Sequence, residues 1–245
     1  MDRAADFIQL FNRVEKYLSQ LVNPEKFLPF WKLVDVASNQ NAAVRANTAA
    51  LKQFAMLRNA ILHDADYPPH IVAVPSEEAL LKFTRVVQEV TDPDPLIPTF
   101  EARLHCFNYS DTLITVLDFM RKHDFSQVLV TNSEGRLRML TVEGITKWFA
   151  DHMGSSQNSA YAALLDGIMA LEPPGSFIIM GPDKTIFDAA DAFRNSIHSE
   201  ATRLYAIVIT ESGCDESGPI GLVTPWDLVH NPKLQKREVD PQSGN

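Results

Sequence analysis

Apolar side chains in the first part of the chain recur with the period of an α-helix. Between residues 4 and 22 they are spaced three and four positions apart, at Phe7, Ile8, Phe11, Val14, Leu18 and Leu21. That spacing gathers them on one side of an amphipathic helix. Further helices are predicted over residues 24–36, 42–63 and 75–91, with a turn at 38–41. We therefore expect an all-α helical bundle over residues 1–95.

The pattern changes beyond a proline-rich stretch at residues 92–98. Short runs rich in valine and isoleucine then alternate with helical segments, at residues 127–131, 137–141, 177–180, 204–210 and 220–224. Such runs are typical of buried strands in α/β units. The chain is thus predicted to be an α+β protein, with its domain boundary at the proline-rich linker.

This second part also repeats itself. Thr112 and Leu113 match Thr185 and Ile186, and Thr141 matches Thr224 in the same order. Each copy is predicted to run strand–helix–strand–strand–helix, the first over about 99–150 and the second over about 171–231. Because neither copy alone buries its sheet well, we expect the two to pack together.

Composition narrows the class of protein. The chain has 245 residues, two cysteines without a C-x-x-C pair, and a net charge of −9. No apolar run approaches the roughly 20 residues that span a membrane, and no secretory signal is visible. The acidic balance argues against a general nucleic-acid coat protein. We expect a cytoplasmic, bacterial protein with a polar tail at 232–245, no metal site and no required cofactor.

One segment, residues 221–228, carries recognisable chemistry. Thr224 is placed to cap a helix whose first residue is Pro225, and a helix start offers free N–H groups to a phosphate. Asp227, in the first turn, could accept hydrogen bonds from both ribose hydroxyls, and Gly221 lets a ligand approach the backbone. The alternative is that Thr224 and Asp227 are simply a capping pair.

This segment resembles the G-h-h-T-x-x-D-h element of cystathionine-β-synthase (CBS) domains, and residues 99–231 resemble a tandem CBS pair. The resemblance implies a disc-like module of two β-α-β-β-α repeats with two clefts between the sheets. It also implies an adenosine-containing regulatory ligand: AMP, ADP, ATP or S-adenosylmethionine.

Carried over by position, the resemblance implies partners for Thr224 and Asp227 in the first copy. These are Thr99, ahead of its first strand, and Ser126, just before the 127–131 strand. Arg203 resembles a phosphate-contacting position and could serve either cleft.

The first copy departs from this pattern. It has Gly144 where the second copy has Asp227, so its ribose acceptor is missing. Glu143 could substitute, but its register differs by one residue. We therefore expect one competent nucleotide site rather than two.

The third predicted helix ends in Arg58, Asn59 and, four residues later, His63. This spacing resembles the R-x(4–6)-H element of HEPN domains, which are all-helical, often dimeric, and in many cases metal-independent endoribonucleases. His63 could act as general base or acid on RNA, and Arg58 could stabilise charge on the phosphate. Asn59 and His63 share a helix face, as residues four apart do.

Arg58 and His63 are five residues apart, which separates them by roughly 140° on an ideal helix. They could converge only if the helix ends near Leu62, or if two protomers each contribute half a site. The alternative is a helix-terminal His63 and a surface ion pair of Arg58.

Two functions follow from these features. The first is a homodimeric regulatory protein in which nucleotide binding to the CBS pair controls a non-catalytic helical domain. The second is a HEPN-type endoribonuclease, with RNA as substrate, that the CBS pair regulates.

Overall fold

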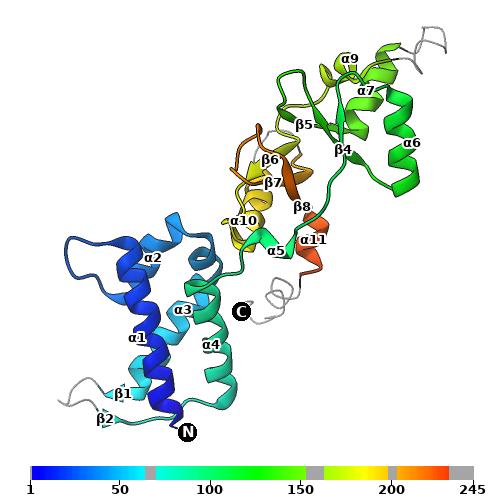
Figure 1. Cartoon of the computed structure of the whole chain (residues 1–245). Helices are drawn as coiled ribbons and strands as arrows, with labels where there is room; N and C mark the ends of the chain where they lie inside the picture. The colour runs from blue at the N-terminus through cyan, green and yellow to red at the C-terminus, as the bar shows by residue number, and fades with distance from the viewer. Residues whose placement is uncertain (1, 64–69, 153–162, 198–202, 232–245) are drawn as a thin grey trace. The chain divides into compact units, whose positions relative to one another are not determined.

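The computed structural model describes residues 2–63, 70–152, 163–197 and 203–231 (Figure 1). For His63 and His70 only the backbone is described, and the predicted polar tail at 232–245 lies outside the described residues. The chain divides into two compact units, Met1–Asp94 and Pro95–Asn245. Of the helices that the structure describes, none has the length and apolar character needed to cross a membrane.

The first unit is helical. Its elements are α1 (Arg3–Val22), α2 (Phe30–Gln40), α3 (Ala42–Ile61), β1 (Leu62–His63), β2 (His70–Ile71) and α4 (Glu77–Thr91). Phe7, Phe54 and Phe83 form the centre of its core, with ring centroids of Phe83 4.7 Å from Phe7 and 4.5 Å from Phe54. The predicted helical bundle is confirmed.

Two details of the predicted helices are wrong. The second helix begins at Phe30 rather than Pro24, because Asn23 ends α1 in the left-handed conformation and Pro29 holds the extended conformation just before α2. The predicted turn at 38–41 is also absent, since α2 continues to Gln40. Asn41 ends α2 and begins α3, and its side chain accepts a hydrogen bond from the Val44 N–H at 2.9 Å.

The second unit contains two sheets of the same topology. The first copy comprises β3 (Cys106–Asn108), α6 (Leu113–His123), β4 (Gln127–Thr131), β5 (Leu137–Thr141) and α7 (Val142–His152). The second comprises β6 (Phe177–Met180), α10 (Ile186–Ile197), β7 (Ala206–Thr210), β8 (Pro219–Val223) and α11 (Pro225–Val229). The sheet orders are β3-β4-β5 and β6-β7-β8, each with a parallel pair followed by an antiparallel pair. The predicted α+β class with two β-α-β-β-α repeats is confirmed.

The two sheets pack on each other through one face. Leu129 and Met139 of the first copy form a buried cluster with Ala206 and Val208 of the second. Neighbouring residues along each strand point the other way, so that Val128 and Val130 pack beneath α6 and α7. This alternation follows from the period of two along a strand. The two copies therefore share a core.

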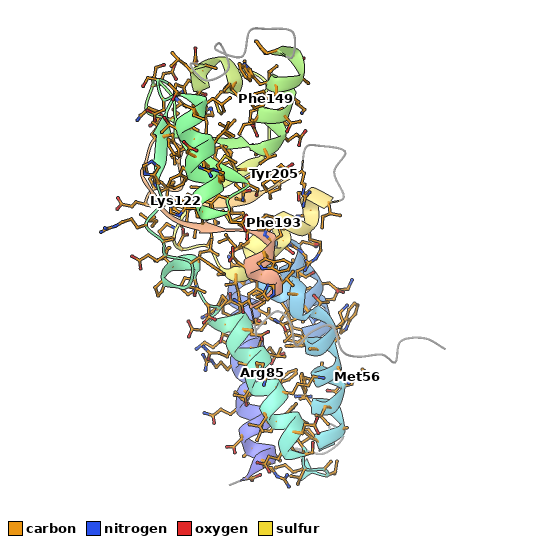
Figure 2. The ribbon with its side chains drawn as sticks, turned by 90° about the vertical axis from the view of Figure 1, so that its right-hand side faces the viewer. Met56, Arg85, Lys122, Phe149, Phe193 and Tyr205 are labelled. Atoms are coloured by element: carbon orange, nitrogen blue, oxygen red, sulfur yellow. The ribbon has the colours of Figure 1, made fainter. Side chains whose placement is uncertain are left out.

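Two short helices cross between the copies. α5 (Leu96–Thr99), which precedes the first copy, buries Leu96 fully in the core of the second, with Phe193 of α10 (labelled in Figure 2). α9 (Leu165–Met169), which precedes the second copy, buries Leu165 in the core of the first, with Trp148. Each copy is thus completed by the segment that leads into the other.

Candidate functional site at the starts of α11 and α7

The start of α11 is a closed capping box. The Thr224 hydroxyl accepts a hydrogen bond from the Asp227 N–H at 3.4 Å. The Asp227 Oδ2 in turn accepts from the N–H and the hydroxyl of Thr224, at 2.7 and 2.6 Å. Pro225 is the first helical residue, as predicted. Asp227 is exposed, and its Oδ1 lies outside the box. The structure therefore contains the capping pair, with one carboxylate oxygen that does not take part in it.

Gly221 lies where another segment of the chain crosses β8. A Cβ at this position would overlap the Phe100 carbonyl oxygen, and Ala102 donates its N–H to the Ile220 carbonyl at 3.1 Å. The close backbone approach at Gly221 is thus made by the protein itself. Because Thr99 immediately precedes Phe100, the structure brings exposed Thr99 next to the strand that leads into Thr224.

Ser126 and Arg203 lie beside the start of α7, in the first copy. The Ser126 carbonyl accepts from the Val142 N–H at 3.0 Å. The Arg203 guanidinium carbon is 5.2 Å from the centre of the Tyr205 ring, and its charge helps to lower the pKa of Glu143 on α7. Arg203 therefore lies beside the start of α7.

The start of α7 is capped differently from the start of α11. Thr141 again accepts a hydrogen bond at its hydroxyl, from the Gly144 N–H at 3.2 Å. Its own N–H donates to Oε2 of Glu172 at 3.1 Å, a residue 31 positions further along the chain. Sequence reasoning missed Glu172, because it lies in the connection between α9 and β6, where no periodic pattern marks it.

Two acidic side chains near this cap have opposite pKa shifts. Burial raises the pKa of Glu172 above its ordinary value, and hydrogen bonds from Thr141 partly offset this. The Glu172 Oε1 is buried without a hydrogen-bond partner among the described residues. The pKa of Glu143 is lowered, first by its hydrogen bond with Lys147 and then by the one from Tyr205.

In the helical unit, two of the three predicted catalytic residues are described with their side chains. Arg58 donates to Oδ1 of the neighbouring Asn59 at 3.2 Å, and its guanidinium carbon is 5.9 Å from the centre of the Phe11 ring. α3 ends at Ile61, and the backbone of His63 pairs with His70 in the β1–β2 ladder. The side chain of His63 lies outside the described residues.

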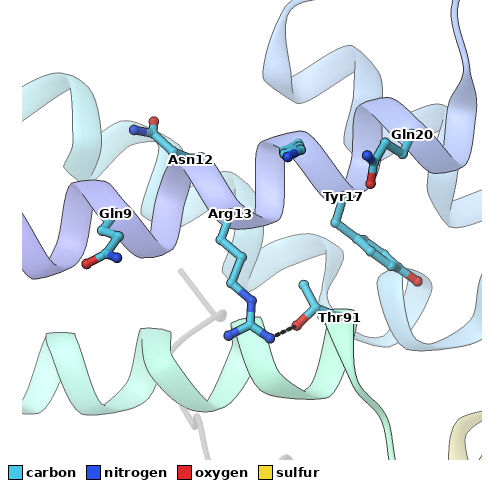
Figure 3. A pocket seen from close by; sticks show the side chains of 7 residues that line it. Gln9, Asn12, Arg13, Tyr17, Gln20 and Thr91 are labelled. Carbon is cyan, nitrogen blue, oxygen red and sulfur yellow. Dashed lines mark hydrogen bonds between the residues drawn. The ribbon is translucent and has the colours of Figure 1, made fainter.

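The helical unit also has a polar groove between α1 and α4 (Figure 3). Its lining includes Arg13 and Lys16 together with amide side chains of α1, and no acidic side chain. Arg13 crosses the groove and donates to the Thr91 hydroxyl at 3.2 Å. No sequence pattern predicted this groove. Over the described ranges, no group of three His, Cys, Asp or Glu side chains is placed to hold a metal ion.

A protein-family model matches the second copy. Residues 175–233 match the CBS domain. The matched residues include β6 to α11 and therefore the whole Thr224–Asp227 cap. No curated protein matches the chain.

Several solved structures are similar to the chain at low identity. CBSX2 in complex with AMP is 13% identical, over 56% of this chain and 95% of that one, with a TM-score of 0.41. Hypoxic Response Protein I with two coordinated zinc ions is 18% identical, over 57% and 100%, with a TM-score of 0.41. The CBS domain of a membrane protein from Sphaerobacter thermophilus is 16% identical, over 62% and 96%, with a TM-score of 0.45.

Proposed function

We propose that the second unit is a tandem CBS pair that binds an adenosine-containing nucleotide at the start of α11 and thereby controls the helical unit. The observation that carries this proposal is the CBS match over residues 175–233, which contains the Thr224–Asp227 cap. The ligand class is AMP, ADP, ATP or S-adenosylmethionine. The repeated sheet topology and the shared core support a pair rather than a single domain.

Asp227 is the proposed ribose acceptor. Its Oδ2 holds the cap, so the hydroxyls of a ribose would be bound by Oδ1. Thr224, at the N-cap of α11, and Thr99, on the segment that crosses β8, would contact the ligand. The resemblance also implied Ser126 of the first copy and Arg203 of the second, but both lie beside the start of α7 and are not part of the site proposed at α11. Gly221 would have a structural role rather than a ligand contact. Any side chain at this position would collide with the Phe100 carbonyl and displace the segment that crosses β8.

The connection between the units suggests how binding would reach the helical unit. The chain leaves the helical unit at Asp94 and enters α5 at Leu96, which is fully buried in the core of the second copy. A ligand at α11 that shifts this core would move the anchor of the linker. Binding energy is transmitted only if the ligand favours one packing over another. We further propose a homodimer, because the helical unit resembles HEPN domains, which are often dimeric.

Thermal unfolding in the presence of each nucleotide tests the binding. A ligand at about 100 times its Kd stabilises the protein that binds it by about 2.7 kcal/mol. The Asp227→Ala variant should lose that shift. Asp188→Ala is the matched control, because Thr185 and Asp188 form the same capping box at the start of α10. Equal shifts in the wild type and both variants would contradict the proposed role of Asp227.

A second candidate, a metal-independent endoribonuclease, is favoured by the end of α3. Leu62, which follows Ile61, is extended with φ −106° and ψ 124°, so His63 does not continue the helix that carries Arg58. The angular separation of the two residues on an ideal helix therefore does not apply. Asn59, bonded to Arg58, would orient the guanidinium toward a phosphate.

This activity is tested by incubating the full chain with RNA in the presence of a chelator. The wild type should cleave, His63→Ala should not, and His70→Ala serves as the control on the paired strand. Cleavage by wild type and His63→Ala alike, or by neither, would remove the candidate.

A further inference from the structure

The two copies cap the helix after their last strand with the same geometry but different acids. In the second copy the Thr224 N–H donates to Asp227, three residues along the same helix. In the first copy the equivalent Thr141 N–H donates to Glu172, which comes from the connection between the copies. In both copies the threonine hydroxyl accepts the N–H of the third helical residue, Asp227 or Gly144.

Gly144 and Glu172 are sterically complementary. A Cβ added to Gly144 would overlap Oε2 of Glu172, and its next contacts would be other atoms of the same glutamate. The space that an aspartate side chain would take at position 144 is therefore filled by the Glu172 carboxylate. Any residue larger than glycine at 144 excludes Glu172 from the cap, and Glu172 in the cap excludes any such residue.

We infer that the Glu172 carboxylate takes the place of the absent aspartate at the Thr141 cap of the first copy and keeps nucleotides out of that position. The capping part of this inference stands on the geometry alone. The exclusion of nucleotides rests on the proposed function of the second copy.

The surroundings of Glu172 fit exclusion rather than ligand binding. Glu143 lies on the same helix start and is held there by Lys147, at 2.7 Å, and by the Tyr205 hydroxyl, at 2.9 Å. Arg203 stands over the Tyr205 ring. Two carboxylates thus share this region with two cations, and Lys147 already pairs with one of the carboxylates. The second carboxylate oxygen of Glu172, Oε1, is buried, whereas Asp227 is exposed, so Glu172 does not offer a ribose the oxygen that Asp227 offers in the second copy.

A double-mutant cycle tests the capping part. Gly144→Asp alone should lower the unfolding temperature by roughly 5 °C, because its side chain collides with a buried carboxylate. Glu172→Ala alone should lower it as well, because the Thr141 N–H loses its acceptor. The double variant rebuilds the Thr-x-x-Asp cap and should be more stable than Gly144→Asp alone. Additive losses would overturn the inference.

Two features of the chain make this cycle interpretable. Gly167→Asp is the matched control, because a Cβ there would meet nothing within 4 Å. Unfolding of the first copy can be followed by tryptophan emission, since Trp148 is 6% exposed whereas Trp31 and Trp226 are 52% and 71% exposed. If Gly144→Asp does not fold, the Thr141 amide signal in wild type and Glu172→Gln gives a second test. It should titrate with pH in wild type only, and titration in both proteins would overturn the inference.

Nucleotide stoichiometry tests the exclusion, with AMP and ATP as probes. The wild type should bind one equivalent, and the Gly144→Asp/Glu172→Ala variant should bind two. One equivalent in both proteins would overturn the exclusion. No binding by the wild type, combined with a coupled stability cycle, would refute the proposed function while leaving the capping role of Glu172 intact.

Discussion

The hydroxyl of Tyr205, just before β7 in the second copy, donates a hydrogen bond to the Glu143 carboxylate on α7 of the first copy, at 2.9 Å. Tyr205 is labelled in Figure 2. This bond and the ion pair between Arg138 and Asp215, at 3.2 Å, are polar links between the copies beside their shared apolar core. Polar contacts as well as apolar packing therefore join the two copies.

Tyr205→Phe should raise the pKa of Glu143 toward its ordinary value of 4.5, because one of the hydrogen bonds that lower it is removed. Since the folded-state pKa of Glu143 is lowered, its stabilising effect is present above pH 4.5 and is lost as the pH falls through the folded value. The variant should therefore differ from wild type at neutral pH and converge on it in acid. Glutamate side-chain NMR through a pH titration measures this, and an unchanged Glu143 titration would contradict it.

Gly221→Ala should destabilise the second unit by about 2 kcal/mol, the cost of overpacking against the Phe100 carbonyl and the Ile209 side chain. Gly218→Ala, at the approach to the same strand, should be nearly neutral because a Cβ there meets nothing within 4 Å. Denaturant unfolding of both variants compares them. Equal stability of Gly221→Ala and Gly218→Ala would show that residues 95–102 are not in close contact with β8 at Gly221.

Leu96→Ala should destabilise the second copy more than the first, although Leu96 precedes the first copy in the chain. Its side chain is fully buried against the second copy, and such a truncation costs about 2–5 kcal/mol. Leu165→Ala should destabilise the first copy more than the second, because Leu165 is buried in the core of the first. Hydrogen exchange should lose protection in β7 and β8 for the former and in β4 and β5 for the latter. The opposite pattern would disprove the crossing of the two short helices.

Glu172→Gln should make the second unit more stable than wild type as the pH rises above 4.5. The pKa of Glu172 is raised in the folded state, so the folded protein favours its protonated form, and ionisation at higher pH costs stability. The glutamine keeps an oxygen for the Thr141 N–H but does not ionise. Thermal unfolding between pH 4 and 7 measures the difference. If the wild type instead became more stable relative to Glu172→Gln as the pH rises, the raised pKa of Glu172 would be contradicted.

Much of the fold could be predicted from the sequence because its signals are local and repeated. The helical period of residues 4–22 and the valine and isoleucine runs mark elements whose own residues define them. The match between Thr141 and Thr224 gave the order of strands and helices in both copies. The start of α2 was missed because Pro24 resembles a first helical residue, whereas the left-handed Asn23 and the extended Pro29 decide where the helix begins.

The candidate site was less predictable because its contacts are long-range. Thr224 and Asp227 are three residues apart, and their capping box follows from the sequence alone. Glu172 accepts the Thr141 N–H from 31 residues away, and Phe100 contacts Gly221 from another segment of the chain. No local residue spacing in the sequence could reveal either contact. The direction of the Arg203 side chain likewise depends on where Tyr205 lies.

Isothermal titration of the full chain with AMP, ATP and S-adenosylmethionine tests the central claim most directly. At least one ligand should bind with one equivalent per chain, and Asp227→Ala should lose that binding. Asp188→Ala, which removes the same kind of cap from α10, should retain it. No heat with any of the three ligands, or equal binding by wild type and Asp227→Ala, would contradict nucleotide recognition at the start of α11.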